Sequence, residues 1–191
     1  MPLIVDKDEI KLQILMAYER LSRQKPLTEI SLREIAAEAG MSHTKVLRYF
    51  NSKNTLYVES ARWATDMMVN DVRQWFDTHS FSDYADERQY IDSFFADVRC
   101  AGSGSVSPRS IVMTCALAAY SEELRQVIQE AYSQLQSVFQ SSLEAAFKRP
   151  LTQQEVYSVS VIYSGVFFSA ANESMPYDSG LQIIGALLKN R

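Results

Sequence analysis

The chain has 191 residues, of which 47% are hydrophobic and 22% charged, values that are ordinary for a globular protein of one or two domains. Its formal net charge of −4 argues against a protein that binds nucleic acid through charge alone. Two cysteines, Cys100 and Cys115, are too few for a disulfide scaffold and lack the spacing of metal ligands. The N-terminus turns acidic after a short apolar run, unlike a signal peptide, so we expect a cytoplasmic protein.

The first predicted helix begins near Asp6, which can cap it, and carries Glu9 in its first turn. Its apolar face repeats every three or four residues and consists of Ile10, Ile14, Ala17 and Leu21. Pro26 lies beyond its end. We expect this helix to cover the two short helices that follow.

Residues 31–50 predict two short helices joined by a tight turn. Ser31 and Glu34 form an S-x-x-E capping box that begins the first of them. Gly40 suits the left-handed backbone conformation that ends a helix, and Ser42 can cap the next one. The second helix would expose polar and basic groups, an arrangement that suits insertion into the major groove of DNA.

The segment I-A-A-E-A-G-M-S-x-x-x-V-L-R-Y-F-N-S-K-N-x-L resembles the N-terminal signature of TetR-type transcriptional regulators, and the resemblance extends over roughly residues 8–60. One position departs from the family pattern. Where the family usually has a tyrosine whose hydroxyl contacts a phosphate, this chain has Leu47, which cannot make that bond. Lys45 and Arg48 could compensate through their charge.

Basic residues are concentrated toward the N-terminus. Residues 1–56 hold 9 Lys and Arg against 7 Asp and Glu, whereas the remainder holds 10 against 16. Near the start of the second short helix, we expect side chains to reach base edges, while Tyr49 and Lys53 are placed for phosphates. Tyr49 could instead pack against the first helix. The predicted DNA-binding residues are Ser31, Arg33, Ser42, His43, Thr44, Lys45, Arg48, Tyr49 and Lys53.

Helical patterns continue through the rest of the chain, at about residues 53–78, 83–101, 108–120, 121–149, 153–172 and 179–189. The helix over 53–78 has no obvious break and would link the head to the body mechanically. Because no strand pattern occurs, the sequence predicts an all-α fold of about nine helices. We expect a helix-turn-helix DNA-binding domain over residues 1–52 and a helical ligand-binding and dimerisation domain over residues 53–191.

The helix over 153–172 is apolar nearly all round and must therefore be covered on every side. Its serines and its length argue against a membrane span. One side can pack on the body, and the resemblance implies that the other joins a partner subunit in a four-helix bundle. The predicted interface residues are Val159, Ile162, Tyr163, Val166, Phe167, Leu181, Ile184 and Leu188.

The resemblance also implies a cavity, enclosed by the fourth to seventh helices, that binds a small inducer. The candidate lining residues are Trp63, Met67, Trp75, Phe94, Phe95, Met113, Cys115 and Tyr120. Each of them could equally be a core residue, because aromatic side chains and methionine at helical spacing usually pack inside a protein. Few charges occur in these helices, so we expect a hydrophobic or aromatic ligand.

Nothing in the sequence points to catalysis. The two histidines, His43 and His79, fall in separate modules, and no nucleophile set, phosphate loop or metal-ligand pair can be assembled. We therefore expect no enzyme activity, no metal and no cofactor. The hypothesis is a homodimeric, ligand-responsive repressor that a small inducer releases from a pseudo-palindromic operator, and an activator or a corepressor-dependent protein remains an alternative. Two other classes stay open, a small-molecule carrier and a protein-interaction adaptor, each with a non-functional head.

Overall fold

The structure is a computed structural model that describes residues 7–101 and 106–172. Within these ranges all regular secondary structure is helical, which confirms the all-α prediction. The α-helices are α1 (Lys7–Ser22), α2 (Leu32–Glu38), α3 (His43–Tyr49), α4 (Lys53–Thr78), α5 (Glu87–Ala101), α6 (Pro108–Ala118), α7 (Glu122–Phe147) and α8 (Gln153–Asn172), with 3-10 turns at Leu27–Glu29 and Phe81–Asp83. The ninth expected helix, over 179–189, lies outside the described residues.

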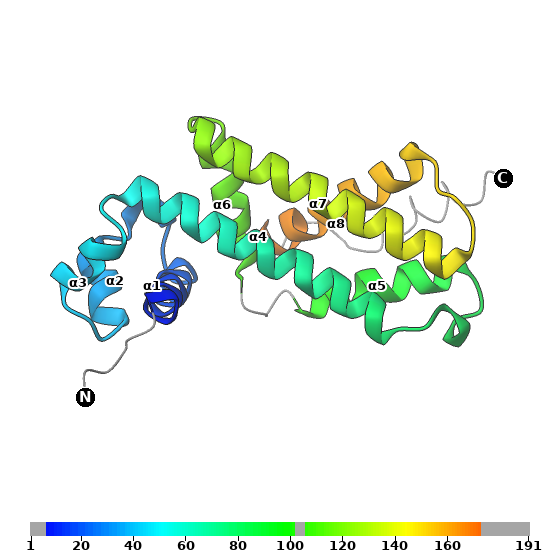
Figure 1. The fold of residues 1–191 in the computed structure, drawn as a ribbon, viewed down its shortest axis with the longest axis horizontal. Coiled ribbons are helices and arrows are strands. Elements are labelled where there is room, and N and C mark those ends of the chain that lie inside the picture. The colour runs from blue at the N-terminus through cyan, green and yellow to red at the C-terminus, as the bar shows by residue number, and fades with distance from the viewer. Residues whose placement is uncertain (1–6, 102–105, 173–191) are drawn as a thin grey trace.

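Helices α1, α2 and α3 form a head at one end of the molecule, and α4 runs from this head into the body (Figure 1). The local signals in the sequence shape the head as predicted. Ser31 accepts a hydrogen bond from the Glu34 amide at 3.2 Å, and the Glu34 carboxylate accepts one from the Ser31 amide at 2.9 Å. Gly40 has φ of +64°, a left-handed conformation that ends α2. The Ser42 hydroxyl accepts from the Lys45 amide and so caps α3.

The head has its own hydrophobic core, to which all of its helices contribute. Ile14 of α1, Ile35 of α2 and Val46 of α3 are fully buried there, together with Phe50 just after α3 and Leu56 from the first turn of α4. Since Phe50 and Leu56 lie on either side of the α3–α4 connection, they fix the start of α4 against the head. The orientation of α3 therefore depends on packing within the head.

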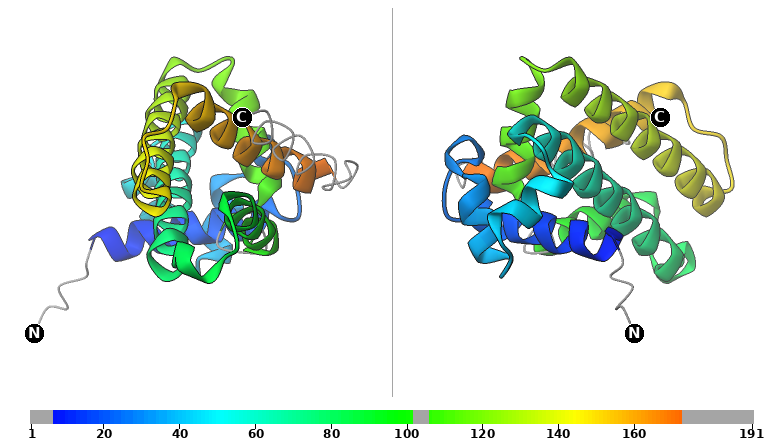
Figure 2. Two further views of the ribbon diagram at one scale, coloured as in Figure 1. Left: turned by 90° about the vertical axis from the view of Figure 1, so that its right-hand side faces the viewer. Right: turned by 60° about the vertical axis from the view of Figure 1, so that its left-hand side comes forward.

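In the body, α4 packs most extensively on α7, while α6 packs on both α7 and α8. The further views show α4 and α7 lying side by side along the length of the body (Figure 2). An aromatic cluster centred on Trp75, Tyr90 and Phe94 joins α4 to α5, and Phe139 and Tyr163 extend it to α7 and α8. No helix within the described residues is long and apolar enough to cross a membrane.

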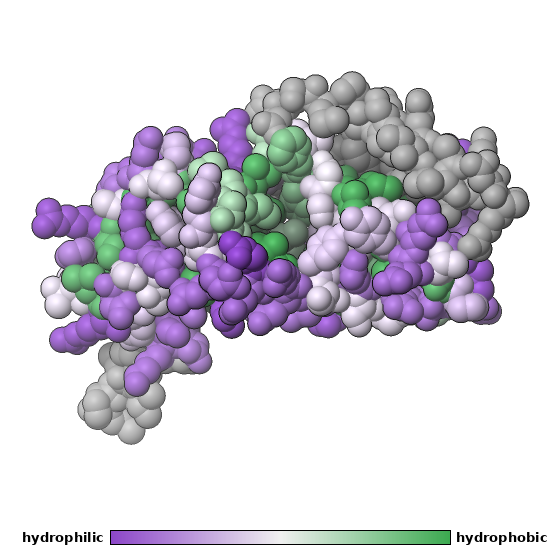
Figure 3. Space-filling view, turned by 90° about the horizontal axis from the view of Figure 1, so that it is seen from above, coloured by the Kyte–Doolittle hydropathy of each residue, from purple (hydrophilic) through white to green (hydrophobic). Residues whose placement is uncertain are grey.

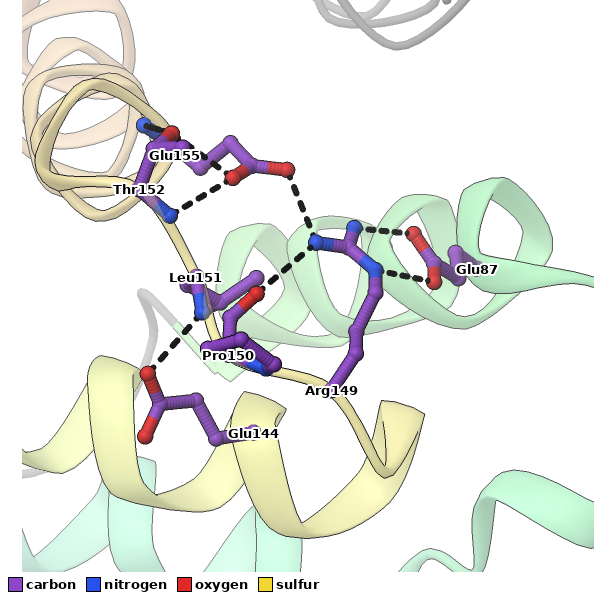
Figure 4. Close-up of polar contacts among 7 residues, drawn as sticks. All are labelled: Glu87, Glu144, Arg149, Pro150, Leu151, Thr152 and Glu155. Atoms are coloured by element: carbon purple, nitrogen blue, oxygen red, sulfur yellow. Dashed lines mark hydrogen bonds and ion pairs between the residues drawn. The ribbon is translucent and has the colours of Figure 1, made fainter.

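Arg149, between α7 and α8, links its own segment to α5 and α8 (Figure 4). Its guanidinium donates two hydrogen bonds to Glu87 of α5, at 2.8 and 2.6 Å, and lies 3.1 Å from Glu155 of α8. Both carboxylates hold the pKa of Arg149 above its usual value. Lys148, which precedes it, adopts a left-handed conformation with φ of 54° and turns the chain at the end of α7.

Arg149→Ala should lower the free energy of unfolding by about 1–2 kcal/mol, because the change removes charge-assisted hydrogen bonds from a partly buried site. Arg88→Ala is the matched control. Arg88 is exposed and contacts Asp92 of the same helix, α5, at 3.5 Å, and such pairs contribute only about 0.3–0.5 kcal/mol. Urea denaturation of the two variants measures the difference, and equal losses would mean that Arg149 does not tie the helices together.

Candidate nucleic-acid interface and body pocket

Val46 of α3 is fully buried, so the opposite face of this helix lies on the surface of the head. Thr44 and Arg48 are exposed on the outer face, while His43 and Lys45 are half-buried at the N-terminal end of the helix. The helix has only two turns, so its side chains project close to one another. The structure thus brings four of the predicted contact residues onto one exposed surface.

Three cations on and beside this surface have no ion-pair partner in the part of the chain that the structure describes. Elsewhere in the head, Arg20 pairs with Glu38 at 2.6 Å and Lys25 pairs with Glu34. Arg33, Lys45 and Arg48, by contrast, form no ion pair with any residue in the described ranges. Unpaired cations near an exposed helix attract polyanions, and the attraction weakens as salt rises.

Some predicted contact residues already have partners inside the protein. The Ser31 side chain belongs to the capping box of α2. Lys25 and Ser31 both hydrogen-bond the Glu34 carboxylate, which lowers the pKa of that group to about 2. Lys53 donates to the Thr28 carbonyl at 2.6 Å, so it braces the turn before α2. An ammonium has three protons, so this bond leaves Lys53 able to donate to a phosphate as well.

Tyr49 and Leu47 lie in different environments on α3. Tyr49 is half-buried and packs against the head core, which agrees with the packing alternative for this side chain. Leu47 is 38% exposed and lies on the outer surface beside Thr44 and Arg48. It contributes no hydrogen-bonding group there, so the phosphate contact that the family tyrosine would make is missing from this position.

A cavity of about 610 Å³ lies in the body, between α4, α6, α7 and α8. The space-filling view shows apolar surface gathered in a recess near the middle of the molecule (Figure 3). The described lining residues include no charged side chain. They are Thr65, Met68, Ile111, Val112, Cys115, Ala116, Ile128, Ala131, Tyr132, Leu135, Tyr163, Ser164, Gly165, Phe167 and Phe168.

Cys115 is the only predicted ligand-binding residue among the described residues that line this cavity. Trp75, Phe94 and Phe95 are buried in the body core, and Trp63 and Met113 pack against the head core. Met68, the neighbour of the predicted Met67, lines the cavity instead of it, and Tyr120 is 92% exposed. The prediction was also incorrect about one wall, because α8 closes the cavity and no described residue of α5 lines it.

The predicted dimer residues of α8 do not lie on its outer face. Tyr163 and Val166 are buried in the core of their own body, and Val159, Ile162 and Phe167 pack against the same core. The exposed apolar residues are instead Tyr157, Val161 and Phe168, which follow one stripe along α8 with Ser164 and Gly165. The other three predicted interface residues, Leu181, Ile184 and Leu188, lie outside the described residues.

One buried charged residue escaped the sequence analysis. Glu19 of α1 is only 3% exposed and accepts a hydrogen bond from the Ser107 amide at the start of α6, at 2.5 Å. Burial raises the pKa of its carboxyl, although hydrogen bonds from Ser107 and Ser110 oppose the rise. A signal was present, because Glu19 falls on the same helical stripe as Leu15, Tyr18 and Ser22, all of which are buried.

Two short capped helices with a left-handed glycine between them and a cationic outer face form a helix-turn-helix head of the kind that DNA-binding regulators use, and a long helix joins this head to an all-α body. Residues 14–59 match the family profile described as bacterial regulatory proteins, tetR family. None of the curated proteins matches the chain in sequence.

Similar solved structures cover nearly the whole chain. They include E. coli NemR in its reduced form (18% identity, 95% of this chain and 96% of that chain, TM-score 0.70) and Salmonella enterica GusR (13%, 97% and 98%, TM-score 0.70). A TetR transcriptional regulator from Rhodococcus sp. RHA1 is also similar (18%, 97% and 98%, TM-score 0.59). The head of this chain therefore matches the tetR family profile, and the chain has the fold of these solved regulators, as the resemblance in its sequence predicts.

Proposed function

We propose that the protein is a dimeric, ligand-responsive repressor that binds a pseudo-palindromic DNA operator through α3. The observation that carries the proposal is the outer face of α3, where Lys45 and Arg48, above the buried Val46, form no ion pair with any described residue. Residues near the start of α3, including His43 and Thr44, would reach base edges in the major groove, and Lys53 would contact a phosphate. Residues 1–52 would act as the DNA-binding domain.

The proposed dimer pairs the first part of the exposed stripe of α8, at Tyr157 and Val161, with the same residues of a second copy. These side chains are 56% and 45% exposed, and large apolar side chains in a row on one helix favour burial against a partner. Two-fold pairing would present two α3 helices to two DNA half-sites.

The proposed effector is an uncharged, largely apolar or aromatic small molecule that occupies the body cavity. Its described lining is apolar, and the hydroxyls of Thr65 and Ser164 already donate to carbonyl groups of their own helices. These hydroxyls can therefore still accept, but a charged ligand would find no counter-ion among the described lining residues. A cavity of about 610 Å³ lies in the range that ordinary small-molecule sites occupy.

Helix α4 offers a route from the cavity to the head. It is a continuous helix of 26 residues whose first turn buries Leu56 in the head core (Figure 1). Farther along, its residues Thr65 and Met68 line the cavity. An effector that favours one tilt of α4 would change the separation of the two α3 helices. It can do so only through a difference between its affinities for the two states.

Lys45→Ala and Lys53→Ala should both weaken DNA binding, but in different ways. Losing a base contact at Lys45 should cost about 1–3 kcal/mol and relax the sequence preference at one position. Losing a phosphate contact at Lys53 should weaken binding evenly across sequences and reduce the slope of the salt dependence by about 1. Fluorescence anisotropy with a panel of duplexes over a salt series measures both effects.

Arg73→Gln is the control for these lysine variants, because it likewise removes one positive charge, but from an exposed position that lies far along α4 from the head. It should leave both affinity and salt slope within experimental error. A change of sequence preference in Lys53→Ala would contradict the assignment of Lys53 to a phosphate. If Lys45→Ala bound every duplex with the same affinity and salt slope as Arg73→Gln, α3 would not be the helix that contacts the bases.

A further inference from the structure

Glu19 joins the head to the body through a contact that does not involve α4. Its carboxylate, buried on α1, accepts the hydrogen bond from the Ser107 amide and is also hydrogen-bonded by the Ser110 side chain. Ser107 is the N-cap of α6, yet its own side chain makes no capping bond. The start of α6 is thus held by an acceptor that the head supplies. Arg23, directly after the end of α1, lies 4.0 Å from the same carboxylate.

Helix α6 has two functional faces. Ser107, Ser110, Met113 and Leu117 recur at three- and four-residue steps, so they share one face. The first two contact Glu19, and the last two pack against the head core. The opposite face carries Ile111, Val112, Cys115 and Ala116, all of which line the cavity.

One short helix therefore separates the cavity from the head. Figure 1 shows α6 at the junction of the two parts, beside the first half of α4. Helix α6 has only 11 residues, so a shift on its cavity side must also displace its head side. The packed core around Met113 and Leu117 resists a gradual deformation and favours a discrete change of docking.

A buried carboxylate is a costly way to hold two elements together. Desolvation disfavours its charged form, and apolar side chains of similar size would often stabilise such an interface as well or better. The carboxylate instead fixes the orientation of α6 relative to α1, because its hydrogen bonds form only when the start of α6 lies at one position beside α1. Two further buried serines, Ser22 and Ser110, complete this polar site within an otherwise apolar junction.

We propose that Glu19 is a positioning residue that couples α6 directly to α1, so that an occupant of the cavity changes the orientation of the head through α6 as well as through α4. The proposal rests on the proposed function, because its consequence is a change of DNA affinity. It adds to that function a named contact that should be needed for the response to ligand and not for DNA recognition itself.

Three variants alter the contact from its two sides. Glu19→Leu fills a similar volume and removes the acceptor, and Ser110→Ala removes one donor from α6. Glu19→Gln keeps an acceptor oxygen for the Ser107 amide and serves as the conservative rescue. Glu9→Ala, on the exposed side of α1, is the control.

Hydrogen exchange of the free protein tests the contact without DNA or ligand. In Glu19→Leu, amides of residues 106–111 should exchange at least about tenfold faster than in the unaltered protein, whereas residues 124–143 of α7 should not change. Ser110→Ala should show a smaller increase, and Glu19→Gln should stay close to the unaltered protein. Unchanged exchange at 106–111 in Glu19→Leu would overturn the proposal.

Coupling is then measured with a covalent occupant of the cavity. In a Cys100→Ser background, N-phenylmaleimide can alkylate only Cys115, which lines the cavity. The probe duplex is one that the unaltered protein selects from a random pool. Alkylation should change its affinity for this duplex at least about tenfold, and the change should fall below about threefold in Glu19→Leu but persist in Glu19→Gln and Glu9→Ala.

The outcomes separate the two proposals. If Glu19→Leu responds to alkylation as strongly as the unaltered protein, α4 alone carries the signal and the role of Glu19 is refuted. If the unaltered protein binds the duplex but does not respond to alkylation, DNA recognition stands and the coupling proposal falls. If the unaltered protein selects no DNA at all, the proposed function itself fails, and the coupling proposal fails with it.

Discussion

Val161→Asp should convert the protein from a dimer into a monomer and weaken its binding to a palindromic duplex by about 100-fold or more. Val161 lies at the centre of the exposed stripe of α8 and is 45% exposed, so the monomer should remain folded. In a dimer, however, the two carboxylates would lie buried near the two-fold axis without partners. Loss of the second half-site contact removes the gain in effective concentration that links the two heads.

Sedimentation velocity checks this result directly, because the chain mass is 21.7 kDa and the dimer has twice that mass. Gln134→Asp, on the exposed surface of α7, introduces the same side chain away from the stripe and should remain dimeric. An unchanged sedimentation coefficient for Val161→Asp would show that the copies associate through another surface.

Phe50→Ala should unfold or severely loosen the head while leaving the body largely intact. Phe50 is fully buried and follows α3 directly, so its removal leaves a cavity beneath this helix. Large-to-small changes of a buried phenylalanine cost about 3–5 kcal/mol, a large share of the stability of a small domain. DNA binding should therefore be lost at 37 °C.

Leu47→Ala is the matched control for Phe50→Ala, since Leu47 lies three residues earlier and is 38% exposed. Its effect on the free energy of unfolding should stay within about 0.5 kcal/mol, as for most surface substitutions. Thermal unfolding followed by circular dichroism compares the two variants. A cost for Leu47→Ala as large as that for Phe50→Ala would mean that α3 is rotated from the orientation described.

The head could be predicted from sequence because its determinants are local. The capping box at Ser31, the left-handed Gly40 and the cap at Ser42 each act within a few residues, and each recurs in the structure as predicted. Lys53 shows the limit of such reasoning, because its contact with the Thr28 carbonyl joins residues 25 positions apart.

The body was less predictable because its helices lack a distinct polar face. Helix α8 is apolar nearly all round, so periodicity could not distinguish the inward Tyr163 and Val166 from the outward Tyr157 and Val161. On α4, Met68 lines the cavity and the predicted Met67 does not, because neighbouring residues of a helix point in different directions. Glu19 meets its partner 88 positions along the chain, and no local pattern identifies such a contact.

The central claim, that α3 of this protein reads DNA, is tested most directly by selection from a pool of random duplexes followed by binding measurements over a salt series. We predict one enriched pseudo-palindromic site, whose affinity falls steeply as salt rises and falls again when either half-site is scrambled. No enriched sequence and no salt-sensitive binding at any protein concentration would contradict the account, and would favour a small-molecule carrier or a protein-interaction adaptor.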